Sequence, residues 1–225
     1  MEKRNHIPGI NYRFNDPCLL QAALTHRSRS KSNNERLEFL GDGILNFVVA
    51  SRLYELNPNN NEGDLSRLRS RVVRGETLSQ LAVKLKLGDY LLLGEGELKS
   101  GGFRRNSILG DALEAVLGAI YIDGGFEACE TVIRTICEPV IANLPDAEDL
   151  KDPKTKLQEQ MQATARALPM YDLVREEGAE HAKKFTIRAR LYDPDMEVEA
   201  SGSSRRKAEQ LAAAMMLSKL IDAKK

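Results

Sequence analysis

The sequence predicts an all-α domain followed by a small α+β domain with the element order α-β-β-β-α. Apolar residues recur at spacings of three and four from Pro17 to about Leu144, and strand signals are scarce there. Three short stretches of alternating apolar and polar residues follow between residues 170 and 202, with a helical pattern on either side. A length of 225 residues with 42% hydrophobic residues suffices for one large core and a smaller second one.

The first domain is predicted to consist of helices joined at turn-forming sequences. The helical spacing is clear at Leu65, Leu68 and Val72, and it continues at Leu78 and Leu81. Turn-forming residues interrupt the pattern at 57–60 (NPNN), 94–96 (GEG), 101–102 (GG) and 123–125 (DGG). We expect a helix connection at each of these four places.

A proline-bounded segment separates the two domains. The sequence LPDAEDLKDP (144–153) carries an acidic cluster and predicts an exposed linker. We therefore place the first domain at residues 1–146, the linker at 147–152 and the second domain at 153–222. In the second domain KTKLQEQMQATA predicts a helix, and MYDLVREE, HAKKFTIRARLY and MEVEASG predict three strands. The segment SSRRKAEQLAAAMMLSKLIDA predicts a closing helix with Ser203 or Ser204 as its N-cap.

Composition argues against several classes of protein. The N-terminal segment MEKRNHIPGINYRF has no apolar signal-peptide core, and no stretch approaches the about 18 continuous apolar residues of a membrane span. We expect a soluble, cytoplasmic protein with no membrane partner. The cysteines Cys18, Cys129 and Cys137 have neither C-x-x-C spacing nor a nearby histidine, which argues against a disulfide framework and a zinc site. We expect all three to be buried.

The zero net charge of the chain conceals an asymmetry. Residues 1–150 carry 18 Lys and Arg against 21 Asp and Glu, a net charge of −3. Residues 151–225 carry 15 against 12, a net charge of +3. Such a split is consistent with a catalytic half and a half that binds a polyanion, although specific motifs must decide.

Carboxylates recur on one face of two apolar helical segments. In NERLEFLGDGILNFVVA, the acids Glu35, Glu38 and Asp42 lie at positions i, i+3 and i+7 and so share one stripe of a helix. The segment SILGDALEAVLGAIYI carries only Asp111 and Glu114, again at i and i+3. The small residues beside this second pair, which leave room for a close helix contact or a ligand, are Gly110, Ala112 and Gly118.

The surroundings of these acids suggest a metal site. Apolar neighbours would partly desolvate the carboxylates, and an unpaired charge there is costly, so a positive group should lie among them. If the two stripes face each other, hard oxygen ligands converge without His or Cys, which favours Mg²⁺ or Mn²⁺. A di-iron bundle is one alternative, but it needs Glu-x-x-His pairs that His6, His26 and His181 do not supply. Two-metal phosphoryl chemistry fits better. The other alternative is that the acids are solvated residues of amphipathic helices.

The string NNERLEFLGD closely resembles the signature of ribonuclease III, a family of endonucleases that cut double-stranded RNA. The resemblance extends through LLQAALTHRS (19–28), EGDLSRLRSRVVRG (62–75) and GEGELKSGGFRRNSILGDALEA (94–115). These blocks follow the family order over nearly the whole first half of the chain. The resemblance implies that the all-α domain is a ribonuclease III endonuclease domain.

The resemblance also implies roles for the acids. Asp42 and Glu114 would be the most sensitive catalytic positions, and Glu35 and Glu62 would support them near the RNA. Mg²⁺ is the implied cofactor, with Mn²⁺ able to substitute and no organic cofactor required. Cleavage would leave 5′ phosphates and 3′ hydroxyls in precursors of rRNA and in some mRNA and tRNA transcripts. The metal ligands that the resemblance implies are Glu38, Asp42, Asp111 and Glu114.

The last helix begins with three cations. Arg205, Arg206 and Lys207 occupy its first turn, where positive charge opposes the helix dipole, so a bound anion is the natural explanation. The second domain resembles the double-stranded RNA-binding domain, which reads the shape of a duplex across two minor grooves. The basic trio would then span the major groove. The residues that the resemblance implies for the minor grooves are Gln158, Glu159, Gln162 and His181.

Cleavage of both strands of a duplex calls for two sites related by a twofold axis, which implies a homodimer. The resemblance places the signature helix at the dimer interface, with Phe39 inserting into the partner; the alternative is that Phe39 belongs to the core. A double-stranded RNA-binding protein with an inactive nuclease half is the main alternative function. The intact set of acids argues against it, because a degenerate site is expected to lose at least one.

Overall fold

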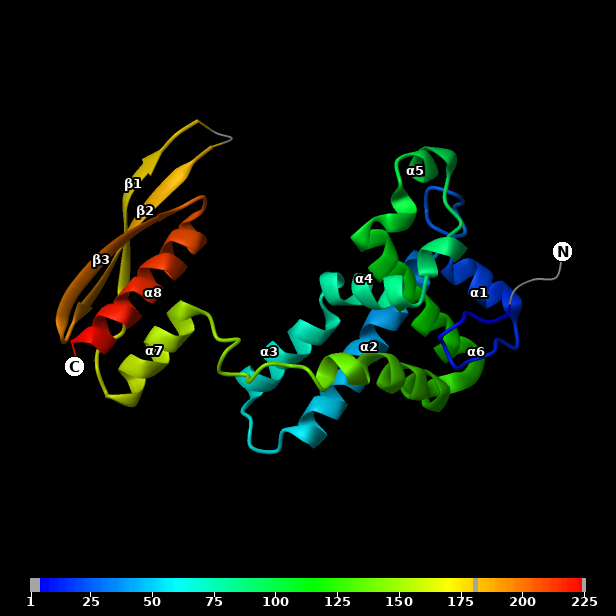
Figure 1. The fold of residues 1–225 in the computed structure, drawn as a ribbon, viewed down its shortest axis with the longest axis horizontal. Coiled ribbons are helices and arrows are strands. Elements are labelled where there is room, and N and C mark those ends of the chain that lie inside the picture. Colours follow the sequence, from blue (N-terminus) through cyan, green and yellow to red (C-terminus); the bar gives the residue numbers. More distant parts are fainter. Residues whose placement is uncertain (1–4, 180–181, 224–225) are drawn as a thin grey trace. The chain divides into compact units, whose positions relative to one another are not determined.

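The computed structural model describes residues 5–179 and 182–223, and the chain divides into two compact units. The first unit extends to Glu148 and the second begins at Asp149, inside the predicted linker. The first unit is helical, and the second combines two helices with an antiparallel sheet (Figure 1). The predicted fold class is therefore confirmed.

The first unit is built around its longest helix, α6 (Asn106–Ile141), against which α1, α2 and α4 pack. Most of the large apolar side chains of α6, from Ile108 to Ile141, are buried. The other elements of this unit are α1 (Pro17–Ala23), α2 (Glu35–Leu56), α3 (Glu62–Val73), α4 (Gly75–Lys84), α5 (Glu95–Lys99) and the short 3₁₀ turns η1 (Leu87–Tyr90) and η2 (Gly102–Arg104).

Helix α6 changes direction where the sequence predicts a connection. Gly125 has φ 81° and ψ −177°, a conformation that glycine adopts readily and that interrupts the helix. Asp123, two residues before Gly125, binds the N-terminal segment to α6 at this kink. Its carboxylate accepts hydrogen bonds from the hydroxyl of Tyr12 (2.7 Å) and from the amides of Asn15 (2.7 Å) and Asp16 (2.9 Å). The predicted break at 123–125 is thus a kink between two helical stretches.

Two glycines set the distance between α2 and α6. A Cβ atom at Gly41 would collide with the carbonyl oxygen of Glu114, and a Cβ atom at Gly118 would collide with the carbonyl oxygen of Leu37. The two helix backbones therefore touch directly, which only residues without a side chain permit. The small residue Gly118 serves the close helix contact that the sequence suggested.

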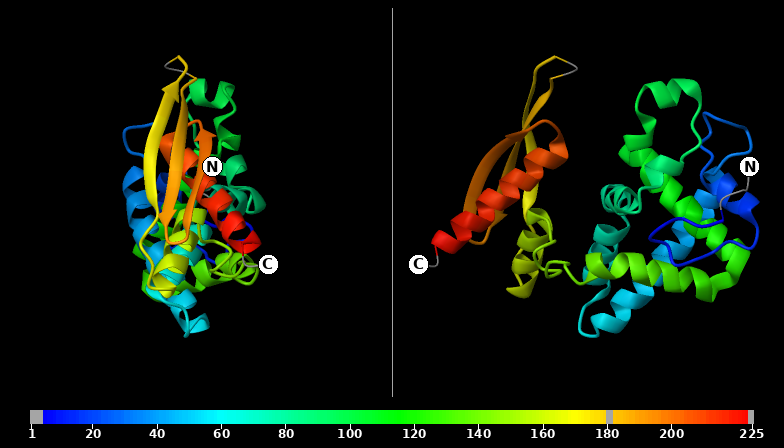
Figure 2. Two further views of the ribbon diagram at one scale, coloured as in Figure 1. Left: turned by 90° about the vertical axis from the view of Figure 1, so that its left-hand side faces the viewer. Right: turned by 45° about the vertical axis from the view of Figure 1, so that its right-hand side comes forward.

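The second unit consists of α7 (Pro153–Ala163), β1 (Met170–Glu177), β2 (Lys184–Tyr192), β3 (Asp195–Gly202) and α8 (Arg205–Asp222). The strands are antiparallel in the order β1-β2-β3. Helix α8 packs on β2 and β3, and α7 packs on α8 (Figures 1 and 2). Ser204 is the N-cap of α8, since its side chain accepts a hydrogen bond from the amide of Lys207. The buried core of this unit is formed by Leu157, Met161, Ala189, Leu191, Ala200, Ala212, Ala213, Met216 and Leu220.

Some expectations about exposure are wrong. Cys129 and Cys137 are buried as predicted, but Cys18 is exposed, because it lies on the outer face of the short helix α1. The linker is also not fully exposed. Ala147 is buried, and the side chain of Lys151 is only 8% exposed where it pairs with Glu159 at 2.6 Å. In the part of the chain that the structure describes, no helix combines the length and the apolar character needed to cross a membrane.

Candidate metal centre and RNA-binding residues

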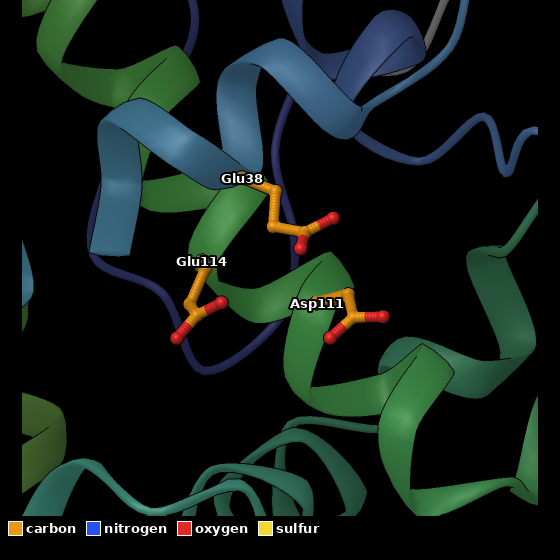
Figure 3. Close-up of side chains that lie close together, drawn as sticks. All are labelled: Glu38, Asp111 and Glu114. Atoms are coloured by element: carbon orange, nitrogen blue, oxygen red, sulfur yellow. The ribbon is translucent and has the colours of Figure 1, made fainter. Parts of the chain in front are cut away.

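Three predicted metal ligands converge in the first unit. Glu38 on α2 faces Asp111 and Glu114 on α6, and one carboxylate oxygen from each lies within 4.8 Å of the others (Figure 3). All three side chains are partly buried. Helical periodicity brings Asp111 and Glu114 together, since residues at i and i+3 lie on the same face of a helix. The contact of Gly41 with Gly118 brings Glu38 close to this pair, because it lets the backbones of α2 and α6 touch beside Glu114.

The pKa values of the clustered carboxylates are raised. Burial raises the pKa of Glu114 to about 8, with further contributions from the charges of Asp42, Glu38 and Asp111. Burial likewise raises the pKa of Glu38 and of Asp111. Within residues 5–179 and 182–223, no Lys, Arg or His side chain forms a salt bridge with any of the three clustered acids. Such a set of hard oxygen donors fits a divalent cation such as Mg²⁺.

Asp42 stands at the edge of this cluster. Its side chain is exposed, and its carboxylate accepts a hydrogen bond from the amide nitrogen of Asn46 at 2.7 Å. It is not one of the three acids whose oxygens lie within 4.8 Å of one another. Its charge nevertheless acts on Glu114, where it is the largest contribution to the raised pKa after burial. The structure thus brings three of the four predicted metal ligands together and places the fourth nearby.

The two predicted supporting acids occupy different places. Glu35 is exposed and pairs with Arg27 at 3.4 Å. It lies in the same pocket as Glu38 and Asp111. Glu62, the first residue of α3, lines another pocket together with Phe47 and does not join the carboxylate cluster of its own chain.

The pocket beside the cluster, with a volume of about 480 Å³, also contains two arginines that are not among the predicted site residues. Arg27 comes from the loop after α1, and Arg105 immediately precedes α6. Their convergence depends on long-range packing. The sequence nevertheless gives some indication of both, because Arg27 lies in LLQAALTHRS and Arg105 in GEGELKSGGFRRNSILGDALEA, two of the segments that resemble ribonuclease III. The remaining lining residues not assigned a role from the sequence are His26, Ser28, Asn34, Glu97, Ser107 and Ile108.

The predicted RNA-binding residues of the second unit are mostly exposed. Gln158 and Gln162 are exposed on α7, whereas Glu159 pairs with Lys151. Arg205 pairs with Glu176 of β1 at 3.5 Å, a contact that the sequence did not reveal. His181 lies outside the described residues. The basic residues whose side chains are exposed in the first turn of α8 are Arg205, Arg206 and Lys207.

Helix α2 carries an exposed aromatic face. The exposed fraction is 83% for Phe39, 61% for Phe47 and 73% for Tyr54. The ring of Phe47 also contacts Phe126 from α6, with ring centroids 5.9 Å apart. The alternative that Phe39 belongs to the core of its own chain is therefore wrong. Apolar side chains exposed on one face of a helix are typical of a surface that binds another protein.

The raised pKa of Glu114 predicts a pH-dependent stability of the metal-free protein. Because its pKa in the folded state is about 8, above the ordinary 4.5, folding favours the protonated acid. This stabilisation is complete below about pH 4.5 and is lost as the pH rises through 8. Thermal unfolding in EDTA should therefore show a lower melting temperature at pH 8.5 than at pH 6. Mg²⁺ binds the deprotonated form and should raise the melting temperature more at pH 8.5.

Glu114→Gln serves as the control, since glutamine does not titrate. The variant should lack the part of the pH dependence that comes from residue 114. Identical pH dependence of the melting temperature for both proteins in EDTA would contradict the assignment of a raised pKa to this residue.

Each of the two units matches a known protein family. Residues 16–140 match the family model "Ribonuclease-III-like", and residues 153–220 match "Double-stranded RNA binding motif". The chain is 51% identical to ribonuclease 3 of Dechloromonas aromatica, over 94% of this chain and 96% of that protein. It is also 51% identical to ribonuclease 3 of Shewanella denitrificans, over 92% of each.

A solved structure is similar to the first unit. The nuclease domain of ribonuclease III from Campylobacter jejuni is 45% identical, covers 58% of this chain and 92% of its own, and has a TM-score of 0.57. The sequence matches span nearly the full chain, and each of the two family models matches residues within one unit of the fold. The chain therefore belongs to the ribonuclease III family.

Proposed function

We propose that this protein is an endoribonuclease that hydrolyses phosphodiester bonds in double-stranded RNA with the help of divalent metal ions. The observation that carries the proposal is the convergence of three partly buried carboxylates without a salt-bridged cation, among the described residues of a chain that belongs to the ribonuclease III family. The products would be RNA ends with a 5′ phosphate and a 3′ hydroxyl. Neither a histidine nucleophile nor the 2′ hydroxyl is needed for such a hydrolysis.

The proposed metal ligands are Glu38, Asp111 and Glu114, with Asp42 beside them. A site with only oxygen donors favours Mg²⁺, and Mn²⁺ can replace it. A divalent ion would neutralise charge on the phosphate and activate water for attack. The protein holds the ligands in place through the backbone contact of α2 with α6, so that little reorganisation is required when the ion binds. Asp42 and Glu114 are the proposed catalytic positions.

The second unit is proposed to hold the duplex. The exposed cations of the first turn of α8 would bind phosphates, and the free amides of a helix N-terminus favour the same anion. Gln158 and Gln162 lie at i and i+4 and so share one face of α7, from which they could reach 2′ hydroxyls in a minor groove. Recognition of this kind reads shape and not sequence.

The protein is further proposed to act as a homodimer through the aromatic face of α2. Phe39, Phe47 and Tyr54 offer this face for contact, and the solved Campylobacter jejuni nuclease domain is described as having a region involved in dimer formation. Glu62 lines an apolar pocket beside Phe47 and Tyr54, so a partner bound there would bring Glu62 close to the second subunit. Two subunits would supply the two sites that cleavage of both strands requires.

Incubation with a long RNA duplex, with and without Mg²⁺, tests the proposed function. We expect cleavage only when the metal ion is present and expect EDTA to abolish it. The new ends should accept ligation through 5′ phosphates, and a single-stranded RNA of the same sequence should stay intact. Products with 2′,3′-cyclic phosphates, or full activity in EDTA, would exclude the mechanism. Tight duplex binding without any cleavage would favour an RNA-binding protein with an inactive nuclease half.

A further inference from the structure

The pocket beside the carboxylate cluster is also lined by two arginines that the proposed chemistry does not use. Arg27 and Arg105 both line this pocket together with Glu38 and Asp111. Each guanidinium is held by a carboxylate of the pocket wall. Arg27 Nη1 lies 3.4 Å from an oxygen of Glu35, and Arg105 Nη1 lies 2.8 Å from an oxygen of Glu97.

Both arginines remain able to bind a further group. The exposed fraction of the side chain is 71% for Arg27 and 52% for Arg105. A guanidinium has five N–H donors in a planar fork, and one ion pair uses only part of them. The two ion pairs therefore leave guanidinium donors of both arginines available for a further group.

The backbone that carries Arg27 is fixed by hydrogen bonds to a distant segment. The amide of His26 donates to the carbonyl oxygen of Leu92 (3.0 Å), and the amide of Gly94 donates to the hydroxyl of Ser28 (2.9 Å). A Cβ atom at Gly94 would collide with the carbonyl oxygen of Ser28, so the two segments touch through their backbones. Arg27 thus belongs to a paired structure and not to a free loop.

Arg105 occupies the N-cap position of α6, where no side chain caps the helix. Ser107 and Ile108 in the first turn line the same pocket, so the positive end of the helix dipole also lies there. The charge of Arg27 acts on the cluster itself. Burial raises the pKa of Glu38 and Asp111, and Arg27 acts in the opposite direction on both.

We propose that Arg27 and Arg105 bind a phosphate of the RNA backbone beside the phosphate that is cut, and that Glu35 and Glu97 position their guanidinium groups. The inference rests on the proposed function. RNA brings a row of negative charges to a pocket that already holds several carboxylates, and the metal ions neutralise only the reacting phosphate. The neighbouring phosphate needs its own partner, and arginine can bind two phosphate oxygens at once.

The proposed phosphate contact can be tested with a series of duplexes. In each duplex one phosphate near a single cleavage site is replaced by a neutral methylphosphonate. Wild-type protein should cut one member of the series more slowly than its neighbours, because that member lacks the charged oxygens that the arginines bind. Arg27→Ala and Arg105→Ala should cut the unmodified duplex about 10- to 100-fold more slowly. Each single variant should lose less activity on the modified member than the wild type does, because only one arginine still binds the phosphate there. The double variant Arg27→Ala/Arg105→Ala should lose no further activity on that member, since both changes remove the same interaction.

Arg104→Ala is the matched control. Arg104 precedes Arg105 in sequence, lies over the ring of Phe103 at 5.0 Å, and is not among the described residues that line the pocket. It should cut the whole series as the wild type does. Melting temperatures identify any variant that fails to fold. In that case Arg27→Lys and Arg105→Lys replace it, because lysine keeps the charge but lacks the planar guanidinium. These variants should show a smaller loss of activity at the same phosphate position.

Two results would overturn the inference while leaving the proposed function intact. One is that the Arg27 and Arg105 variants cut the unmodified duplex as fast as Arg104→Ala. The other is that their losses and the loss from every methylphosphonate simply multiply. Failure of the wild type to cut any duplex in Mg²⁺ would instead overturn the proposed function, and this inference with it.

Discussion

Glu114→Gln is expected to lower the turnover of duplex cleavage by about 100-fold or more while duplex affinity barely changes. Glutamine keeps the size of the side chain but removes the charge of the most strongly perturbed acid in the cluster. A divalent ion would lose a ligand that no described residue of the cluster replaces. Single-turnover cleavage at saturating RNA measures the chemical step, and a gel-shift titration without metal measures binding.

The reciprocal variant replaces Arg205, Arg206 and Lys207 with alanine. These cations lie in the first turn of α8, in the unit that does not hold the carboxylate cluster. Their loss should weaken duplex binding about equally for all sequences and reduce its dependence on salt, because fewer counterions are released. Turnover at saturating RNA should survive. Equal losses of binding and turnover in both variants would mean that the two functions are not separable. Normal cleavage by Glu114→Gln would contradict the proposed metal site.

Gly41→Ala is expected to lower the free energy of unfolding by about 2 kcal/mol and to weaken Mg²⁺ binding. The added methyl group would meet the backbone of Glu114 and Gly118, which cannot give way as the end of a side chain can. Overpacking of this kind costs roughly 1–3 kcal/mol or more, and the gain in helix propensity of about 1 kcal/mol offsets only part of it. The helices must then separate, which moves Glu38 away from Glu114.

Gly43 provides a matched control in the same helix. A Cβ atom at Gly43 meets nothing within 4 Å, so Gly43→Ala should gain helix propensity and stabilise the protein by about 0.5–1 kcal/mol. Thermal unfolding followed by circular dichroism at matched protein concentrations compares the two. If Gly41→Ala melts at the same temperature as Gly43→Ala, the close backbone contact does not exist in solution.

Local sequence signals were sufficient for most elements of the fold. The alternation of apolar and polar residues predicted the three strands of the second unit to within a few residues. In β2, for example, the buried Ile187, Ala189 and Leu191 fall on one face. The capping preference of serine placed the start of α8, although only the structure distinguishes Ser204 from Ser203. The short elements η1, η2 and α5 were not predicted, because three to five residues are too few for a periodic pattern.

The candidate site was predicted in part. The spacing of Asp111 and Glu114 along one helix is a local property, so it could be inferred directly. The position of Glu38 depends on where α2 crosses α6, and the sequence offered Gly118 as a hint but not its partner Gly41. The contact of Asp42 with Asn46 is local, because the two residues lie at i and i+4 of α2. The convergence of Arg27 with Arg105 depends on tertiary packing, which no periodicity in the sequence reports.

The carboxylate of Asp123, which holds the N-terminal segment, has a consequence for folding during synthesis. Its hydrogen-bond partner Tyr12 precedes it by 111 residues. A ribosome makes about 5–20 residues per second, so the N-terminal segment waits for several seconds before its anchor exists. Helices α1, α2 and α4 all pack on α6 and also wait until it has been made, α1 for the longest and α4 for the shortest time. The second unit has its long-range contacts within fewer than 80 residues. The nuclease unit can therefore complete its core only when synthesis has passed α6, and until then the apolar side chains of α2 that are buried in the finished fold, such as Leu45 and Leu53, lack the helix that covers them.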